Sequence, residues 1–189
     1  MELRSKKISK LTREIDNSYY IANYRDCPRF ETLCKECPNY GARWGCPPFH
    51  DNPQPLLEQF NTAKLVLIKV DIEKECAESK SELVQAMTRL IQRTRKEFET
   101  ELLEIEKHTN GRAALFTGLC PHCGNESCAR RIGQPCRHPN LTRPALEALG
   151  FNIDRTVTDY FGIDLLWVED KETPEYICLV GAVFLNYDS

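Results

Sequence analysis

Seven of the ten cysteines in this 189-residue chain fall into two compact sets, and this distribution constrains the fold more than any other feature. The seven residues are Cys34, Cys37 and Cys46 in the first set, and Cys120, Cys123, Cys128 and Cys136 in the second. A chain of this length with 41% hydrophobic residues can bury a sizeable core without cross-links. The cysteines are therefore expected to serve chemistry, and metal binding is the first hypothesis.

Charge and hydropathy narrow the environment in which the thiols would act. Residues 1–8 lack an apolar stretch of signal-peptide length, and no segment approaches the roughly 18 to 20 apolar residues of a membrane span. We expect a cytoplasmic protein, in which thiols stay reduced and free to bind metal. The net charge of -3, the pI near 5.9 and the lack of a long basic run argue against nucleic acid or a membrane surface as partners.

The apolar pattern predicts regular elements after the first cysteine set. The run 63–72 is short, apolar and rich in β-branched residues, which indicates a buried strand. Over 79–108 apolar residues recur every three or four positions, which indicates a long amphipathic helix, and Ser79 with Glu82 fits a capping box. The remaining expected elements are a strand at 112–119, short helices at 143–149 and 153–161, and paired strands at 165–169 and 176–185.

These elements predict the α+β class, with a small mixed or antiparallel sheet packed by the long helix and with cysteine-rich metal-binding loops. Residues 1–55 show little sustained periodicity and are expected to form a loop-rich, cysteine-rich N-terminal extension. Residues 63–189 are expected to form the core, with the second cysteine cluster at 120–136 following a core strand. Because no linker or internal repeat is visible, we expect one domain over 1–189.

The second set gives the strongest metal signal, because four soft thiolates within 17 residues can surround one centre. Structural zinc ribbons use two C-x2-C knuckles, whereas here only Cys120 and Cys123 form one. Cys128 and Cys136 are single ligands spread along the loop, and such uneven runs are common in iron-sulfur sites. The spacing favours a 4Fe-4S cluster on these four thiolates, with zinc as the alternative.

The first set leaves the number of ligands open. Cys34, Cys37 and Cys46 supply three thiolates, and Cys27 upstream is a possible fourth. A closed four-thiolate site holds structure or passes electrons, whereas a three-thiolate site keeps a position at which a substrate can bind. The spacing does not decide between the two.

Residues near the ligands can tune an anionic centre. Four thiolates around zinc or an oxidised 4Fe-4S core carry a formal charge of roughly -2, which nearby cations and donors stabilise. Arg130, Arg137 and His138 lie within a few residues of the second set, and Trp44 could keep water off a cluster. The plainer interpretation places each of them in a solvated loop or a small apolar patch.

Several segments carry a resemblance to a known family, namely 33–49, 118–123, 135–139, 143–150 and 154–156. On these residues the chain resembles the DUF2284 family of predicted metal-binding proteins, over most of its length. The resemblance implies a metal-binding, iron-sulfur protein of anaerobes without a settled reaction. It also implies a pattern that includes the seven clustered cysteines but not reliably Cys27, which favours three protein thiolates at the first site.

Three functions fit these observations. The first is electron transfer, alone or within a reductase, through one or two 4Fe-4S clusters and a redox partner protein. The second is an enzyme that activates a substrate at an open three-cysteine cluster. The third is a zinc-stabilised binding module whose recognition surface is Tyr40, Trp44 and Phe49. No nucleotide-binding, hydrolase or zincin motif is present, so the sequence names no catalytic residue and no reaction.

Overall fold

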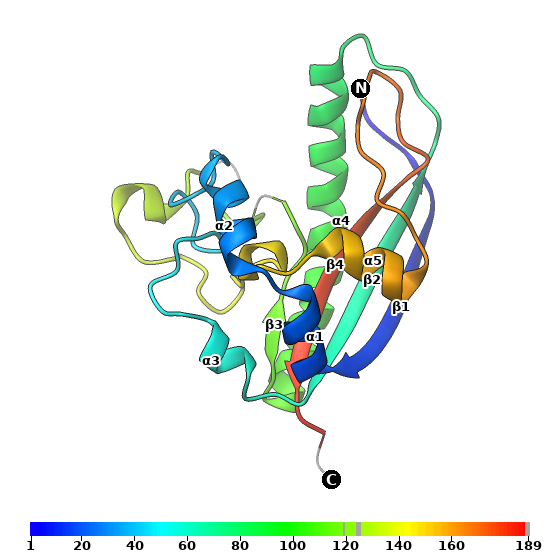
Figure 1. Cartoon of the computed structure of the whole chain (residues 1–189). Coiled ribbons are helices and arrows are strands. Elements are labelled where there is room, and N and C mark those ends of the chain that lie inside the picture. The colour runs from blue at the N-terminus through cyan, green and yellow to red at the C-terminus, as the bar shows by residue number, and fades with distance from the viewer. Residues whose placement is uncertain (119, 124–125, 188–189) are drawn as a thin grey trace.

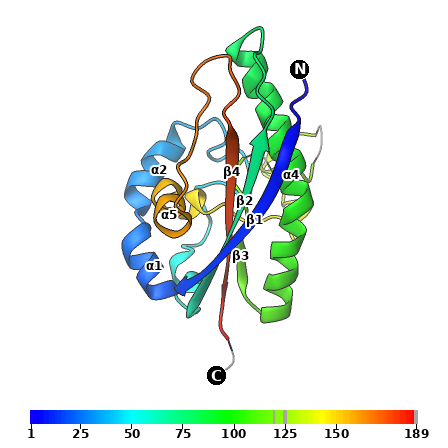
Figure 2. The ribbon, with the colours of Figure 1, turned by 90° about the vertical axis from the view of Figure 1, so that its right-hand side faces the viewer.

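The computed structural model of the chain describes residues 1–118, 120–123 and 126–187. A four-stranded antiparallel sheet with the order β1-β2-β4-β3 runs through the molecule (Figure 1). Its strands are β1 (Ser5–Asp16), β2 (Thr62–Ile72), β3 (Arg112–Ala114) and β4 (Tyr176–Leu185). Figure 2 shows the sheet edge-on, with α4 (Lys80–Thr109) on one face and α1 (Asn17–Tyr24), α2 (Cys27–Lys35) and α5 (Ile153–Phe161) on the other. The predicted α+β class is confirmed.

The two faces of the sheet form two core clusters. On β2, Val66 and Ile68 belong to the cluster under α4, whereas Leu65 and Leu67 belong to the cluster under α1 and α5. Successive strand side chains point to opposite faces, so a strand covered on both sides must be apolar throughout. This explains why the continuous run at 63–72 predicts β2 so closely.

The helix α4 agrees with the prediction from its periodicity. Its N-cap is Ser79, whose side chain accepts a hydrogen bond from Glu82 N at 3.1 Å. Its C-cap is Asn110, which adopts the left-handed conformation with φ 48°. The helix packs directly on β4 at Gly181, where a Cβ would lie 2.7 Å from Leu102 Cδ1. Only glycine permits so close an approach of helix and strand.

The expectation of a loop-rich first 55 residues is wrong, because β1, α1 and α2 lie within them, and a short helix, α3 (Gln54–Leu57), begins at their end. The strand β1 was hidden because it is an edge strand with mostly exposed or half-exposed side chains, which leaves it without an apolar face in the sequence. None of the helices in the described part of the chain combines the length and hydropathy needed to cross a bilayer.

Three later elements also differ from the predictions. The segment 165–169 forms no strand, since β4 pairs instead with β2 and β3. The helix expected at 143–149 is reduced to a 3-10 turn, η2 (Glu147–Leu149). Of the strand expected at 112–119, only residues 112–114 form β3, and Leu119 lies outside the described residues.

Candidate metal centre

The first cysteine set follows from the way α2 ends. Asp26 caps the helix by accepting a hydrogen bond from Arg29 N at 3.2 Å, and Cys34 lies in its last turn. Cys37 N then donates to Cys34 O at 3.0 Å. A further turn closes where Cys46 N donates to a carbonyl three residues earlier at 3.1 Å. These tight turns fold the three cysteines into one loop, residues 34–48, which we call the inner loop.

The second set lies on a longer stretch, residues 120–142, which we call the outer loop and of which residues 124 and 125 lie outside the described residues. Thr142 Oγ1 lies 3.9 Å from Cys120 Sγ and 3.4 Å from Cys136 Sγ. The Cys136 sulfur also accepts the backbone N–H of His138 at 3.4 Å. The Thr142 hydroxyl thus lies between the first and last cysteines of the set, and His138 contacts the Cys136 sulfur through its backbone N–H.

Arg137 lies beside the second set, as its position in the sequence suggests. Its Nη1 donates to Ser127 O at 2.9 Å and lies 3.8 Å from Cys123 Sγ. The same nitrogen forms an ion pair with Glu126 at 3.4 Å. Arg137 is therefore a cation in contact with a candidate ligand.

Arg130 fastens the outer loop to the inner loop. It extends from the 3-10 turn η1 (Ala129–Ile132), and its Nη1 donates to Arg43 O at 2.7 Å and to Cys46 O at 2.6 Å. Its Nη2 donates to Pro48 O. The planar guanidinium satisfies three backbone acceptors of one loop, which a point charge cannot do.

Trp44 completes this contact between the loops. The Arg130 guanidinium lies over its ring at 5.3 Å from the centroid, and its Nε1 donates to Gln134 O at 3.1 Å. The side chain stays partly exposed, at 37% for the residue. Trp44 therefore packs the two loops together and covers one side of the region between them.

A cavity of about 630 Å³ lies between the inner loop, α4 and the segment 143–148. Four cysteines line it, namely Cys34, Cys37, Cys46 and Cys120. Much of the remaining wall is apolar and includes Val84, Ile91 and Phe116. Its size falls within the roughly 300 to 1,000 Å³ of ordinary ligand sites. The fold thus brings one cysteine of the second set to the first set, an association that the spacing did not predict.

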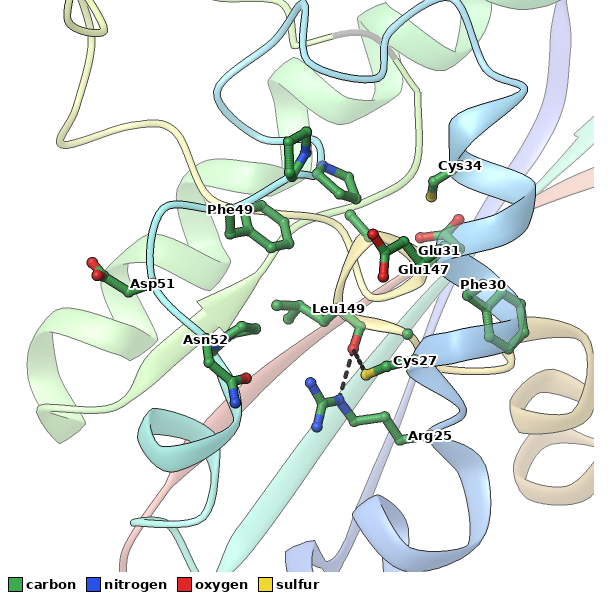
Figure 3. A pocket seen from close by; sticks show the side chains of 15 residues that line it. Arg25, Cys27, Phe30, Glu31, Cys34, Phe49, Asp51, Asn52, Glu147 and Leu149 are labelled. Atoms are coloured by element: carbon green, nitrogen blue, oxygen red, sulfur yellow. Dashed lines mark hydrogen bonds between the residues drawn. The ribbon is translucent and has the colours of Figure 1, made fainter.

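Cys27 lies in a different position from these four residues. It lines a separate cavity of about 340 Å³, whose wall also includes Cys34 and Glu147 (Figure 3). Its thiol donates to Leu149 O at 3.7 Å, and a Cβ on Gly150 would lie only 2.8 Å from its sulfur. The Cys27 side chain is thus packed against the 3-10 turn η2.

The family model of DUF2284, described as a predicted metal-binding protein, matches residues 21–185. The chain belongs to the DUF2284 family. The match contains all seven clustered cysteines and Cys27, and it supports metal binding without specifying the metal. Comparisons with curated proteins and with solved structures returned no significant match.

The donors of this DUF2284 chain fit a soft metal centre by their chemistry. All ten cysteines, each of them among the described residues, are free thiols. Within residues 1–118, 120–123 and 126–187, no three His, Cys, Asp or Glu side chains are grouped as a single metal ion requires. The four cavity thiols line the cavity wall, and among the described residues they are not grouped at one point. Thiolate donors of this kind select zinc, copper(I) or iron-sulfur clusters.

Burial disfavours the thiolate form of three of the cavity cysteines. It raises the pKa of Cys34 and of Cys46, and the nearby Cys37 raises both further. Burial also raises the pKa of Cys120, although the side chains of Thr142 and Arg95 work in the opposite direction. Because thiolates are the metal-binding form, metal uptake here must release protons.

A buried ion pair on α4 lies beside the cavity, and the sequence analysis missed it. Arg95 Nε donates to Glu99 Oε1 at 2.5 Å, and both side chains are at most 5% exposed. His122 Nε2 lies 4.0 Å from the other Glu99 oxygen, and burial lowers the pKa of this histidine. Arg95 Nη1 lines up with no hydrogen-bond acceptor among the described residues. The sequence does carry a signal for this pair. Ile91, Arg95 and Glu99 are spaced four residues apart, so both charged residues lie on the apolar face of the helix.

Glu147 is a second carboxyl group at the cavity that the sequence did not indicate; the residue is half-buried. Its side chain lines both the large cavity and the smaller one in Figure 3. Burial raises its pKa, and its Oε2 has no hydrogen-bond partner in the part of the chain that the structure describes. Arg95 and Glu147 thus present unsatisfied polar atoms in the wall of a cavity bordered by four thiols. No sequence signal marks Glu147, because its burial depends on the packing of η2 against the inner loop.

Proposed function

We propose that this DUF2284 protein binds a 4Fe-4S cluster in the large cavity and transfers electrons to or from a partner protein, alone or within a reductase. A cytoplasmic location, where thiols stay reduced, belongs to the proposal. The observation that carries it is the cavity itself, which gathers Cys34, Cys37 and Cys46 around a space. A cluster has several separated iron corners, so ligands around a space suit it better than ligands that meet at a point.

The residues of the chain would bind and tune the cluster in three ways. The thiols of the inner loop give up their protons when they bind, which the raised pKa values of Cys34 and Cys46 make dependent on pH. Arg95 Nη1 is available to donate to a sulfur acceptor. Hydrogen bonds to sulfur and exclusion of water set the reduction potential of such centres. A bound 4Fe-4S cluster would supply one-electron redox chemistry.

The test is a redox titration of protein reconstituted with iron and sulfide without oxygen. We expect a broad visible absorption that a low-potential reductant bleaches and that mild oxidation restores. Cys46→Ser should remove this chromophore, whereas Cys76→Ser is a matched control because that exposed thiol lies outside both loops. Absence of any reducible chromophore in the wild-type protein would overturn the proposal.

Substrate activation at an open cluster is the second candidate function. It is favoured by Arg95 Nη1 and Glu147 Oε2, which find no hydrogen-bond partner among the described residues and belong to side chains in a cavity with partly apolar walls. Buried donors and acceptors without partners cost roughly 1 to 3 kcal/mol each, and a small polar substrate would satisfy them. In this case added sulfide or a small thiol should shift the absorption and electron paramagnetic resonance spectra of the reconstituted protein. Unchanged spectra at saturating thiol would favour electron transfer.

A further inference from the structure

Cys120 begins the outer loop, where its sulfur lies 3.9 Å from Thr142 Oγ1, and the end of β3 leads the chain toward it. Leu115, directly after β3, pairs with Ala145, and Leu115 N donates to Pro144 O at 2.9 Å. At Gly118 the chain turns with φ +104°, and a Cβ there would lie 3.2 Å from Ile91 Cγ2. At Gly118 the chain thus lies close to α4, and Cys120 lines the wall of the large cavity.

Cys27 is the obvious alternative as fourth ligand, because it lies seven residues before Cys34 on the same helix. Its thiol is nevertheless directed at Leu149 O, 3.7 Å away, and lines the smaller cavity in Figure 3. The large cavity includes Cys37 and Cys46 in its wall but not Cys27. Cys27 would have to leave the carbonyl and the packed Gly150 to reach a centre shared with those two residues.

We propose that Cys120 is the fourth thiolate of the cluster held by Cys34, Cys37 and Cys46, and that Cys27 is not a ligand. This inference rests on the proposed function. It differs from the grouping that the spacing predicts, in which Cys120 belongs with the three other cysteines of the outer loop. The centre then joins the inner loop to the strand that leaves the sheet, and the Arg130 contact holds the remainder of the outer loop against it.

Ligand exchange accounts for the assembly without any change of oxidation state. When the donor is a preformed 4Fe-4S core with four small-molecule thiolate ligands, four protein S–H bonds and four Fe–S bonds to the donor ligands break. Four Fe–S bonds to the protein form, and the donor ligands leave as thiols with the four protons. With an oxidised 4Fe-4S core the product has a formal charge of roughly -2. Arg43, which also lines the cavity, and Arg95 supply nearby positive charge. A centre with four protein thiolates has no open position, so the inference selects electron transfer over substrate activation at this site.

The experiment compares single and double variants reconstituted without oxygen. Iron and acid-labile sulfide per chain are measured together with the electron paramagnetic resonance spectrum of the reduced protein. We expect Cys120→Ser and Cys46→Ser to lose or alter the same signal, and the double variant to lose no more iron than either single variant. Cys27→Ser should match the wild type in iron, sulfide and spectrum. Alanine variants at the same positions and circular dichroism establish that any loss is not a failure to fold.

Two outcomes would overturn the assignment while leaving the proposed function intact. In the first, Cys120→Ser keeps the signal that Cys46→Ser loses, or the double variant loses the sum of the two losses. In the second, Cys27→Ser loses the same signal as Cys46→Ser. A wild-type protein that takes up no iron and sulfide would instead refute the proposed function, and the ligand assignment with it.

Discussion

Replacing Arg130 tests whether this residue acts through its charge or through its shape. The guanidinium donates to three carbonyls of the inner loop and lies over Trp44. A hydrogen bond with a charged donor contributes about 1.5 to 3 kcal/mol when buried. Because Arg130 is only partly buried, we reduce the combined loss on Arg130→Met to about 2 to 3 kcal/mol. This corresponds to about one and a half to two orders of magnitude in the equilibrium for opening the inner loop.

Amide hydrogen exchange, followed by mass spectrometry on metal-loaded protein, measures that opening. In Arg130→Met, protection of residues 34–48 should fall by roughly 30-fold to 150-fold, the factor that this free energy gives. Protection of β2 should remain unchanged, because its hydrogen bonds lie in the sheet. Arg131→Met is the matched control, since it is the neighbouring and exposed arginine of η1.

Arg130→Lys separates the two explanations, because it keeps the positive charge and loses the planar fork. If the clamp on the three carbonyls is what matters, this variant should exchange nearly as fast as Arg130→Met. Wild-type protection in Arg130→Lys would refute the reasoning and would assign Arg130 the role of a general counter-charge.

Two further predictions concern stability. Arg143→Met leaves the half-buried Glu106 carboxylate, which Arg143 contacts at 2.5 Å, with only the backbone N–H of Ala113 as a donor among the described residues. It should lower the free energy of unfolding in urea by about 1.5 to 3 kcal/mol, the loss of a charged hydrogen bond. Lys10→Met, which breaks an exposed pair, should cost at most about 1 kcal/mol. Burial raises the pKa of Glu106, but its hydrogen bonds to Arg143 and Ala113 lower it by a larger amount, so the net shift is downward. Wild-type stability should therefore fall as the pH drops below the ordinary value of 4.5, whereas Arg143→Met should lose stability as the pH rises above that value. The same dependence of stability on pH in both proteins would contradict this prediction. Gly181→Ala places a methyl group against Leu102 and should lower the free energy of unfolding by about 1 to 3 kcal/mol. A thermal unfolding curve identical to that of the wild type in calorimetry would contradict this and would show that α4 can shift.

The sequence predicts those parts of the fold whose signals are local. The helix α4 has a regular apolar stripe and both of its caps, and β2 has a continuous apolar run. The strand β1 lacks such a signal because an edge strand needs little buried surface. The apolar run 165–169 is the opposite case, because it has the composition of a strand but forms none. The strand β3 pairs with β4 only at 182–184, and the segment 165–168 lines a cavity beside 177–180 without pairing with it, with Trp167 74% exposed.

The candidate site divides in the same way. The clustered cysteines and the position of Arg137 beside Cys123 follow from short spacings. The approach of Cys120 to the inner loop depends on where β3 and α4 place the strand exit, which is a long-range property. The spacing of ligands in a sequence indicates that a metal is bound, but the sheet decides which ligands can share it.

The most direct test of the central claim is the content of iron, zinc and acid-labile sulfide in wild-type protein purified without oxygen, together with its absorption spectrum. The proposal predicts at least about four iron and four sulfide per chain, the composition of one 4Fe-4S cluster, with a broad visible band. Stoichiometric zinc without sulfide and without visible absorption would contradict it and would make the cysteine loops structural.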